Sequence, residues 1–249
     1  MKLLENKVAI ITGSASGIGK AAAILYAREG AIVVISDIDE KGGNAVVNEI
    51  KKSGGEAMFV KSDSSDPQAN KTLVDQTVSK YGKLDIAVNN AGIGGPLSAT
   101  GEYPIDGWQK VININLSGVF YGMRYQIPAM AQGGGSIINV ASILGMAGTR
   151  FSPAYVAAKH GVVGLTKAAA LEYADKKIRI NSIGPGYINT PLITNSLDEA
   201  TIKSLISLHP IGRLGESEEI AELILWLGSD KSSFVTGSYY PVDGGYLAQ

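Results

Sequence analysis

Short runs of β-branched and aliphatic residues alternate with longer segments of helical periodicity along nearly the whole 249-residue chain. The helical segments, such as 21–28, 73–81 and 162–173, carry apolar residues three and four positions apart. Parallel strands joined by crossover helices give this order of elements, because each helix must cover one face of the sheet. The sequence therefore predicts an α/β, doubly wound fold, with helices on both faces of a seven-stranded parallel sheet. The predicted strands are 8–11, 32–35, 57–60, 84–88, 136–140, 178–183 and 238–242.

No low-complexity linker or shift in composition divides the chain, so residues 1–249 are expected to form a single domain. Segment 187–213 interrupts the alternation directly after a predicted strand and is rich in Thr, Asn, Ser and Leu. Loops at that end of a strand often cover ligands, so we expect this segment to be a lid over a substrate.

Composition excludes several classes of function. Lys and Arg total 22 against 23 for Asp and Glu, so no basic excess is available for nucleic acid. The chain has no cysteine and only two histidines, which excludes disulfides and thiol catalysis and argues against a metal site. The start of the chain lacks the apolar stretch of a signal peptide, and the apolar run 223–227 is too short to span a membrane. We therefore expect a cytoplasmic protein that binds neither nucleic acid nor membrane.

The first predicted strand runs into the glycine-rich segment Thr12-Gly-Ser-Ala-Ser-Gly-Ile-Gly19, and a helical pattern follows at once. Glycine permits a tight turn and lets the backbone approach a pyrophosphate, while the helix N-terminus offers free N–H groups to the anion. A glycine cluster alone also serves any tight turn. A strand before it, a helix after it and an acidic residue further on together predict a dinucleotide-binding Rossmann fold. The expected contacts in this segment are Gly13, Ser16, Gly17, Ile18 and Gly19.

The acidic residue is Asp37, which stands at the end of the second predicted strand and is followed by Ile38. A carboxylate there accepts hydrogen bonds from both hydroxyls of the adenosine ribose and repels a 2′-phosphate. No Lys or Arg lies in the glycine segment before Gly19 or directly after Asp37, so NAD is the expected cofactor. The alternative is a turn aspartate, because Asp39 and Glu40 follow closely.

Two further strand ends carry candidate cofactor contacts. Asp63 could meet the adenine amino group, although a helix-cap role for Asp63 or Asp66 competes evenly. The fourth predicted strand closes on a run of small residues, where a doubly wound sheet places its ligand, although such runs are also plain turns. The residues expected to contact the cofactor here are Asp63, Ser64, Asn90, Ala91 and Gly92.

Tyr155 and Lys159 are four residues apart at the start of a predicted helix, so they share one face. A free tyrosine has a pKa of about 10, and an ammonium within about 4–6 Å lowers that value. Ser142, just past the fifth predicted strand, could hold a substrate oxygen beside the phenol. Each feature alone has an ordinary interpretation, as a surface pair on a helix or as a turn serine.

In order and spacing these motifs resemble the short-chain dehydrogenase/reductase family over nearly the entire chain. Asn115 matches the family's catalytic asparagine better than Asn113 does. The segment 242–246 is similar to the family's C-terminal signature. The motifs that carry the resemblance are 12–19, 89–92, Asn115, Ser142, Tyr155, Lys159, Pro185 and Gly186.

The resemblance implies an NAD-dependent oxidoreductase that interconverts a secondary alcohol and a ketone. It makes Tyr155 the acid/base, with Lys159 lowering its pKa and hydrogen-bonding the nicotinamide ribose. Ser142 would orient the substrate oxygen, and Asn115 would anchor a water that links Lys159 to solvent. The segment after the sixth strand would contact the nicotinamide end through Pro185, Gly186, Ile188 and Thr190.

The substrate is harder to predict than the chemistry. The residues that could line a substrate site are mostly apolar, which indicates a small to medium hydrophobic or cyclic alcohol and its ketone. Alternatively, several of these residues merely pack the lid against the core. The candidate substrate contacts are Ser142, Ile143, Leu144, Met146, Tyr187 and Leu192.

Two other functions compete. A dinucleotide-binding module without turnover would be expected to have lost a catalytic residue, and every one is present here. A reductase of 3-oxoacyl groups on an acyl carrier would need cationic side chains to bind the acidic carrier. Loop 129–135 has no Lys or Arg, which disfavours this function without excluding it.

The resemblance also implies assembly, since enzymes of this family are commonly homotetramers built through long helices and the last strand. Segment 162–173 offers the small residues 168–170 for close helix approach, and the aromatic end 239–242 offers apolar surface. The alternative is that these residues complete the core of the monomer.

Overall fold

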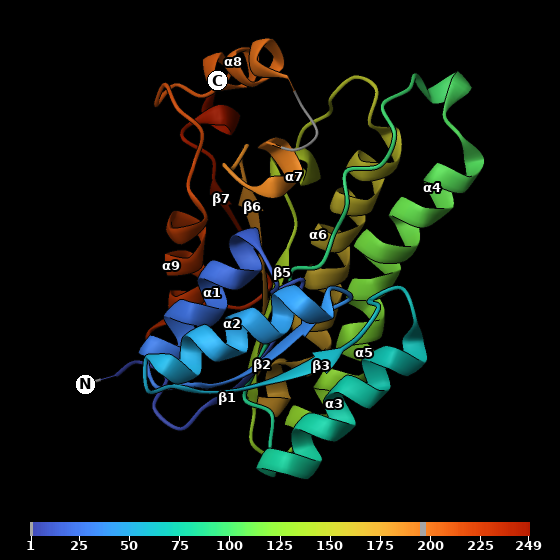
Figure 1. Ribbon diagram of the computed structural model, residues 1–249. Helices are drawn as coiled ribbons and strands as arrows, with labels where there is room; N and C mark the ends of the chain where they lie inside the picture. Colours follow the sequence, from blue (N-terminus) through green and yellow to red (C-terminus); the bar gives the residue numbers. More distant parts are fainter. Residues whose placement is uncertain (1, 195–197) are drawn as a thin grey trace.

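The computed structural model describes residues 2–194 and 198–249, and its centre is one parallel sheet (Figure 1). Seven strands pair in the order β3-β2-β1-β4-β5-β6-β7, which confirms the predicted α/β, doubly wound architecture. The strands are β1 (Val8–Thr12), β2 (Ile32–Asp37), β3 (Glu56–Lys61), β4 (Ile86–Asn89), β5 (Gly135–Val140), β6 (Ile178–Pro185) and β7 (Tyr239–Val242).

Helices cover both faces of this sheet (Figure 1). Alternate residues of a strand point to opposite faces, so each strand feeds two cores. Ile11 and Ile35 pack into the core that α1, α2 and α9 cover, whereas Ile10 and Val34 face α3, α5 and α6. The helices are α1 (Gly17–Arg28), α2 (Glu40–Lys52), α3 (Pro67–Tyr81), α4 (Ile105–Ile112), α5 (Gly118–Met130), α6 (Pro153–Tyr173), α7 (Pro191–Thr194), α8 (Glu199–Ser207) and α9 (Ser217–Gly228).

The strands differ from the prediction mainly at their carboxyl ends. β1, β2 and β6 each run one or two residues further, to Thr12, Asp37 and Pro185. These polar or small residues extend the strands because a neighbouring strand pairs with them, as in Asp37 with Lys61. All carboxyl ends meet at one edge of the sheet, and the strand order reverses between β1 and β4. That reversal is where a doubly wound sheet binds its ligand.

The predicted lid, 187–213, is partly helical rather than irregular. It contains α7 and α8, and residues 195–197 of the predicted segment lie outside the described residues. α8 begins where the Asp198 side chain accepts a hydrogen bond from the Thr201 amide at 2.8 Å, which caps its first turn. Both helices lie beyond the carboxyl ends of the strands (Figure 1).

Candidate active site

The glycine turn after β1 is built jointly with the end of β4. Gly13 has φ +63°, and a methyl group there would lie 2.8 Å from the Ala91 Cα, so only glycine fits. The Asn90 side chain donates to the carbonyls of Thr12 at 2.9 Å and Gly13 at 3.0 Å. The Thr12 hydroxyl accepts the amides of Asn90 and Ala91. Asn90, predicted as a cofactor contact, therefore also braces the turn, a role that its sequence position did not reveal.

The N-terminus of α1 is open to an anion. Ser16 precedes the helix without capping it through its side chain, and the first turn holds no acidic residue. The first amides of the helix therefore remain available as donors. A methyl group on Gly17 would lie 3.3 Å from the Thr190 Cγ2, so the segment after β6 faces this turn directly.

A cleft of about 290 Å³ runs along these strand ends. It joins the glycine turn, the ends of β2, β3 and β4, and the start of the lid. The structure brings together the predicted residues Gly13, Ser16, Gly17, Ile18, Asp37, Ile38, Asp63, Ser64, Asn90, Ala91, Gly92, Thr190 and Leu192. Gly19 does not line it but packs beneath the turn, against the Gly13 carbonyl. The sequence prediction missed the lining residues Ser62, Ile93, Ile114 and Pro191.

Asp37 lies in the wall of the cleft. One of its carboxylate oxygens accepts the Ala15 amide at 2.9 Å and the other accepts the Asp39 amide at 3.0 Å. It thus forms the turn of the alternative interpretation while still lining the cleft. Lys61, its partner in β3, is a nearby cation that the sequence did not reveal, because it comes from another strand. The Lys61 ammonium lies 3.7 Å from the Glu40 carboxylate.

The two aspartates after β3 divide the roles left open by the sequence. The Asp63 carboxylate accepts both the amide and the hydroxyl of Ser65, at 2.8 and 2.7 Å, which makes it a turn residue that also lines the cleft. Asp66 caps α3 by accepting the Gln68 amide at 2.8 Å.

Tyr155 and Lys159 share a face in the first turns of α6, as predicted. The Lys159 Nζ lies 5.5 Å from the centre of the Tyr155 ring and donates to the Val140 carbonyl at 2.8 Å. Lys159 is only 3% exposed. Ser142 follows β5, and its hydroxyl accepts the Leu144 amide at 3.2 Å. Three of the four predicted catalytic residues thus meet where β5 ends and α6 begins.

The electrostatics of this group differ from the expectation. Burial raises the pKa of Tyr155, and the interaction with the Ser142 side chain offsets only part of the rise. The pKa was expected to fall because of Lys159. Burial also lowers the pKa of Lys159, to about 8, because it disfavours the charged ammonium. The half-buried Tyr155 phenol therefore has a pKa above its usual value.

Asn115, the fourth predicted catalytic residue, lies in a π-helical turn, Asn113–Ser117, between α4 and α5. Its side chain both accepts the Ile93 amide at 2.9 Å and donates to the Ile93 carbonyl at 2.8 Å. A methyl group on Gly92 would lie 3.3 Å from the Asn115 Oδ1 and 3.7 Å from the Lys159 Nζ. Gly92 therefore lets the asparagine and the lysine approach one region, as a shared catalytic role requires.

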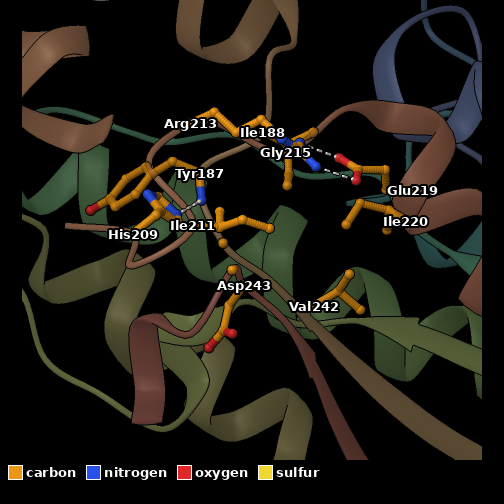
Figure 2. Close-up of a pocket in the computed structure, with 12 residues that line it drawn as sticks. Tyr187, Ile188, His209, Ile211, Arg213, Gly215, Glu219, Ile220, Val242 and Asp243 are labelled. Carbon is orange, nitrogen blue, oxygen red and sulfur yellow. Dashed lines mark hydrogen bonds and ion pairs between the residues drawn. The ribbon is translucent and has the colours of Figure 1, made fainter. Parts of the chain in front are cut away.

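The residues after β6 divide between two cavities. Thr190 lines the cleft, whereas Gly186 and Ile188, also predicted as cofactor contacts, line a second cavity of about 60 Å³ (Figure 2). Ile188 is buried and forms a parallel bridge to Gly215. Pro185 closes β6. This predicted contact set is therefore not assembled around a single cavity.

The residues predicted to contact the substrate also differ in their exposure to solvent. Ile143 and Leu144 are buried, at 1% and 6% exposure, as the packing alternative expects. Met146 and Leu192 are about half exposed. Tyr187 packs edge-on against His209, with 5.7 Å between ring centres.

Comparison with known proteins agrees with this geometry. A family model described as Enoyl-(Acyl carrier protein) reductase matches residues 13–247. A solved short-chain type dehydrogenase/reductase from Mycobacterium marinum superposes with a TM-score of 0.94 at 37% identity, covering 99% of this chain and 97% of that chain. The chain belongs to the short-chain dehydrogenase/reductase family.

Curated relatives of this short-chain dehydrogenase/reductase are similar over almost their whole length. Cyclohexanol dehydrogenase of Acinetobacter sp. (strain SE19) is 54% identical over 98% of this chain and 96% of its own length. Cis-4-hydroxycyclohexanecarboxylate dehydrogenase of Sinomonas cyclohexanicum is 43% identical over 98% of this chain and 97% of its own length.

Membership of the family confirms the reaction class predicted from the sequence. The protein is an oxidoreductase that interconverts a secondary alcohol and a ketone with a nicotinamide dinucleotide cofactor. In the part of the chain that the structure describes, no helix has the length and apolar character needed to cross a membrane.

Proposed function

We propose that this enzyme is a cytoplasmic, NAD-dependent dehydrogenase of cyclic secondary alcohols and a reductase of the matching ketones. Asp37 carries the choice of cofactor, because its carboxylate lines the cleft at the end of β2, where it would meet the ribose and oppose a 2′-phosphate. Similarity to two dehydrogenases that are named for alcohols of the cyclohexane ring supports the choice of a cyclic substrate. Met146 and Leu192, apolar and about half exposed, agree with a hydrophobic substrate.

The described residues fit a dinucleotide. Gly13 and Gly17 line the cleft without side chains, and the first amides of α1 are free for a pyrophosphate. When bound, the cofactor would supply or accept the hydride. Tyr155 would donate its phenolic proton to the ketone oxygen in reduction and take it back in oxidation. Ser142 would hold that oxygen, and Lys159 with Asn115 would return the proton from solvent.

The cofactor proposal predicts a measurable preference. With cyclohexanone as substrate, kcat/KM should be at least ten-fold higher with NADH than with NADPH, about 1.4 kcal/mol. Asp37→Asn removes the charge yet keeps an acceptor for the Ala15 amide, so it should narrow this ratio. Lys52→Ala, at an exposed lysine at the end of α2 and outside the cleft lining, is the control and should leave the ratio unchanged. Equal efficiencies in the unmodified enzyme would refute the assignment.

The same assay separates the substrate classes. Cyclohexanone should be reduced with higher kcat/KM than 2-hexanone, a ketone with the same number of carbons and an open chain. A reductase of carrier-bound 3-oxoacyl groups is the second candidate, and similarity to the 3-oxoacyl-[acyl-carrier-protein] reductase of Thermotoga maritima, 42% identical over 98% of this chain, favours it. Preference for a 3-oxoacyl thioester over both ketones would establish that candidate instead.

We also propose that segment 187–213 acts as a lid, since Thr190 and Leu192 already form part of the cleft wall. The lid would exclude water from the hydride-transfer step.

A homotetramer is proposed for the assembled enzyme. On α6, Gly164, Ala168 and Leu171 are exposed and share one helix face, with Leu171 85% exposed. Other residues of the predicted interface lie in the monomer's own core, as Val162 and Ala169 do. Light scattering at micromolar concentration should give four times the chain mass of 26.0 kDa. Leu171→Lys should lower that mass, whereas a monomer in the unmodified protein would contradict the proposal.

A further inference from the structure

His209 is a buried histidine that no part of the mechanism uses. It is 3% exposed and follows α8, between the end of β6 and the C-terminal tail (Figure 2). Its Nδ1 lies 2.9 Å from the Leu205 carbonyl, which can only accept a hydrogen bond. Its Nε2 lies 3.2 Å from the Tyr187 amide, which can only donate one. These partners require a neutral imidazole with its proton on Nδ1.

The glycine before Tyr187 leaves room for this contact. A methyl group on Gly186 would lie 2.8 Å from the His209 Nε2 and 3.1 Å from the Asp243 Cα. The residue at 186 therefore has to be small for the imidazole to reach the backbone. The position of His209 is therefore one reason why residue 186 is a glycine in this chain.

The rest of the Tyr187 backbone is held separately. Its carbonyl accepts the Gly215 amide at 3.1 Å, and the Asn189 amide donates to the Gly215 carbonyl at 2.8 Å. Loss of the His209 bond would leave both of these bonds in place. The contribution of His209 is thereby confined to the amide side of Tyr187 and to its ring.

The Tyr187 ring is fixed by two other rings. It meets His209 edge-on at 5.7 Å between centres and 83° between planes, and it meets Tyr246 at 6.1 Å and 68°. His209 and Tyr246 are themselves 5.8 Å apart. This aromatic cluster of Tyr187, His209 and Tyr246 joins the end of β6, the lid and the tail. Gln249 strengthens the junction by donating to the Leu208 carbonyl at 3.0 Å.

Tyr187 follows the strand that pairs with the strand leading to the catalytic residues. β6, which it follows, pairs with β5, the strand that leads to Ser142. Val140 pairs with Ile183 in the register of these strands, and the Ala141 amide donates to the Ile183 carbonyl at 2.9 Å, so the two segments leave the sheet side by side. Burial is the main cause of the raised pKa of Tyr155, and the Tyr187 phenol adds to it. Tyr187, two residues past the end of β6, therefore lies beside the segment that carries Ser142.

We propose that His209 is a positioning residue, which holds the Tyr187 amide and ring so that Tyr187, where the lid begins, forms a wall of the ketone site beside the segment that carries Ser142. Tyr187 would then contact the ring of a cyclic ketone, and His209 would act only through Tyr187. The inference rests on the proposed function for the identity of that ketone.

Two variants separate the two hydrogen bonds of His209. In His209→Gln the side-chain amide oxygen can reach the position of Nε2 and accept the Tyr187 amide. In His209→Asn the shorter amide can replace Nδ1 and donate to Leu205, but it leaves Tyr187 without an acceptor. His209→Phe keeps a ring in the cluster and removes both bonds.

The test measures KM and kcat for the ketone that the unmodified enzyme reduces best, together with the NADH dissociation constant. His209→Phe and His209→Asn should raise KM at least ten-fold, with kcat and the NADH dissociation constant within about three-fold, and His209→Gln should recover most of the loss. His160→Phe, at the exposed second histidine, should change nothing. Equal KM in all variants, or parallel losses in KM, kcat and NADH binding, would overturn the proposal. If the best ketone is acyclic, the proposed function fails while this test still stands.

Discussion

Tyr155→Phe should lower kcat between a hundred-fold and ten-thousand-fold in both directions of the reaction, the usual contribution of a positioned acid or base. The substitution keeps the ring and removes the only atom that carries the transferred proton. NADH should still bind, although Tyr155 is itself an expected cofactor contact, because the cleft at the glycine turn and the strand ends is unchanged. Stopped-flow or steady-state absorbance of NADH gives kcat, and fluorescence titration gives the dissociation constant.

The pH dependence of the unmodified enzyme supplies an independent check of Tyr155. Burial raises its pKa, so the phenolate needed to take a proton from the alcohol grows scarcer as pH falls. Alcohol oxidation should therefore accelerate as pH rises from neutral into the alkaline range, while ketone reduction, which uses the protonated phenol, should stay flat. Tyr173→Phe, at the far end of the same helix, is the matched control and should retain activity. Retention of a tenth of kcat by a folded Tyr155→Phe enzyme would require another acid.

Much of the fold could be predicted because strands buried on both faces must be continuously aliphatic. β1 is wholly buried, and its run Val-Ala-Ile-Ile is visible in the sequence without any structural knowledge. The strand ends could not be predicted in the same way. Asp37 and Pro185 have little intrinsic preference for strands, and they are extended because β3 and β7 pair with them.

The chemical identity of the site followed from the sequence, but the contacts that support it did not. Residues four positions apart in a helix lie on the same face, so the proximity of Tyr155 and Lys159 was predictable. The direction of the Tyr155 pKa was not, because the expectation counted the neighbouring charge and could not count burial. The π-helical turn at Asn115 has no periodicity signal, since α4 and the turn itself pack against α6, far along the chain.

His209 illustrates what single-sequence reasoning cannot detect. A lone histidine in a polar segment has no motif, and its partners Tyr187 and Tyr246 come from two other parts of the chain. Only the packing of the lid and tail around the end of β6 brings the three rings together. A tertiary constraint of this kind becomes visible once the backbone amide that it satisfies is identified.

Lys159→Met should abolish most of the activity without lowering the free energy of unfolding. A pKa lowered from 10.5 to about 8 means that the buried charge destabilises the fold by roughly 3 kcal/mol at neutral pH. Removing the ammonium abolishes this destabilisation by the buried charge. It also leaves the Val140 carbonyl without its hydrogen-bond donor, which costs about 1–3 kcal/mol. The free energy of unfolding at pH 7 should therefore be unchanged or higher by up to about 2 kcal/mol. Over the same change, kcat should fall at least a hundred-fold and NADH should bind about ten-fold more weakly.

The pH dependence of stability gives the sign of this effect separately. Between pH 8 and 10.5 the unfolded chain keeps a proton on residue 159 that the folded chain has released, so the unmodified enzyme should gain stability relative to Lys159→Met as pH rises. Below pH 8 both states carry the proton, and the difference between the two proteins should be constant. Denaturant titrations at pH 7, 8, 9 and 10 measure it, with Lys167→Met, at an exposed lysine on the same helix, as the control. A gap between the two proteins that does not change with pH would mean that Lys159 is not held as a buried cation. Its part in proton return would then need a different explanation.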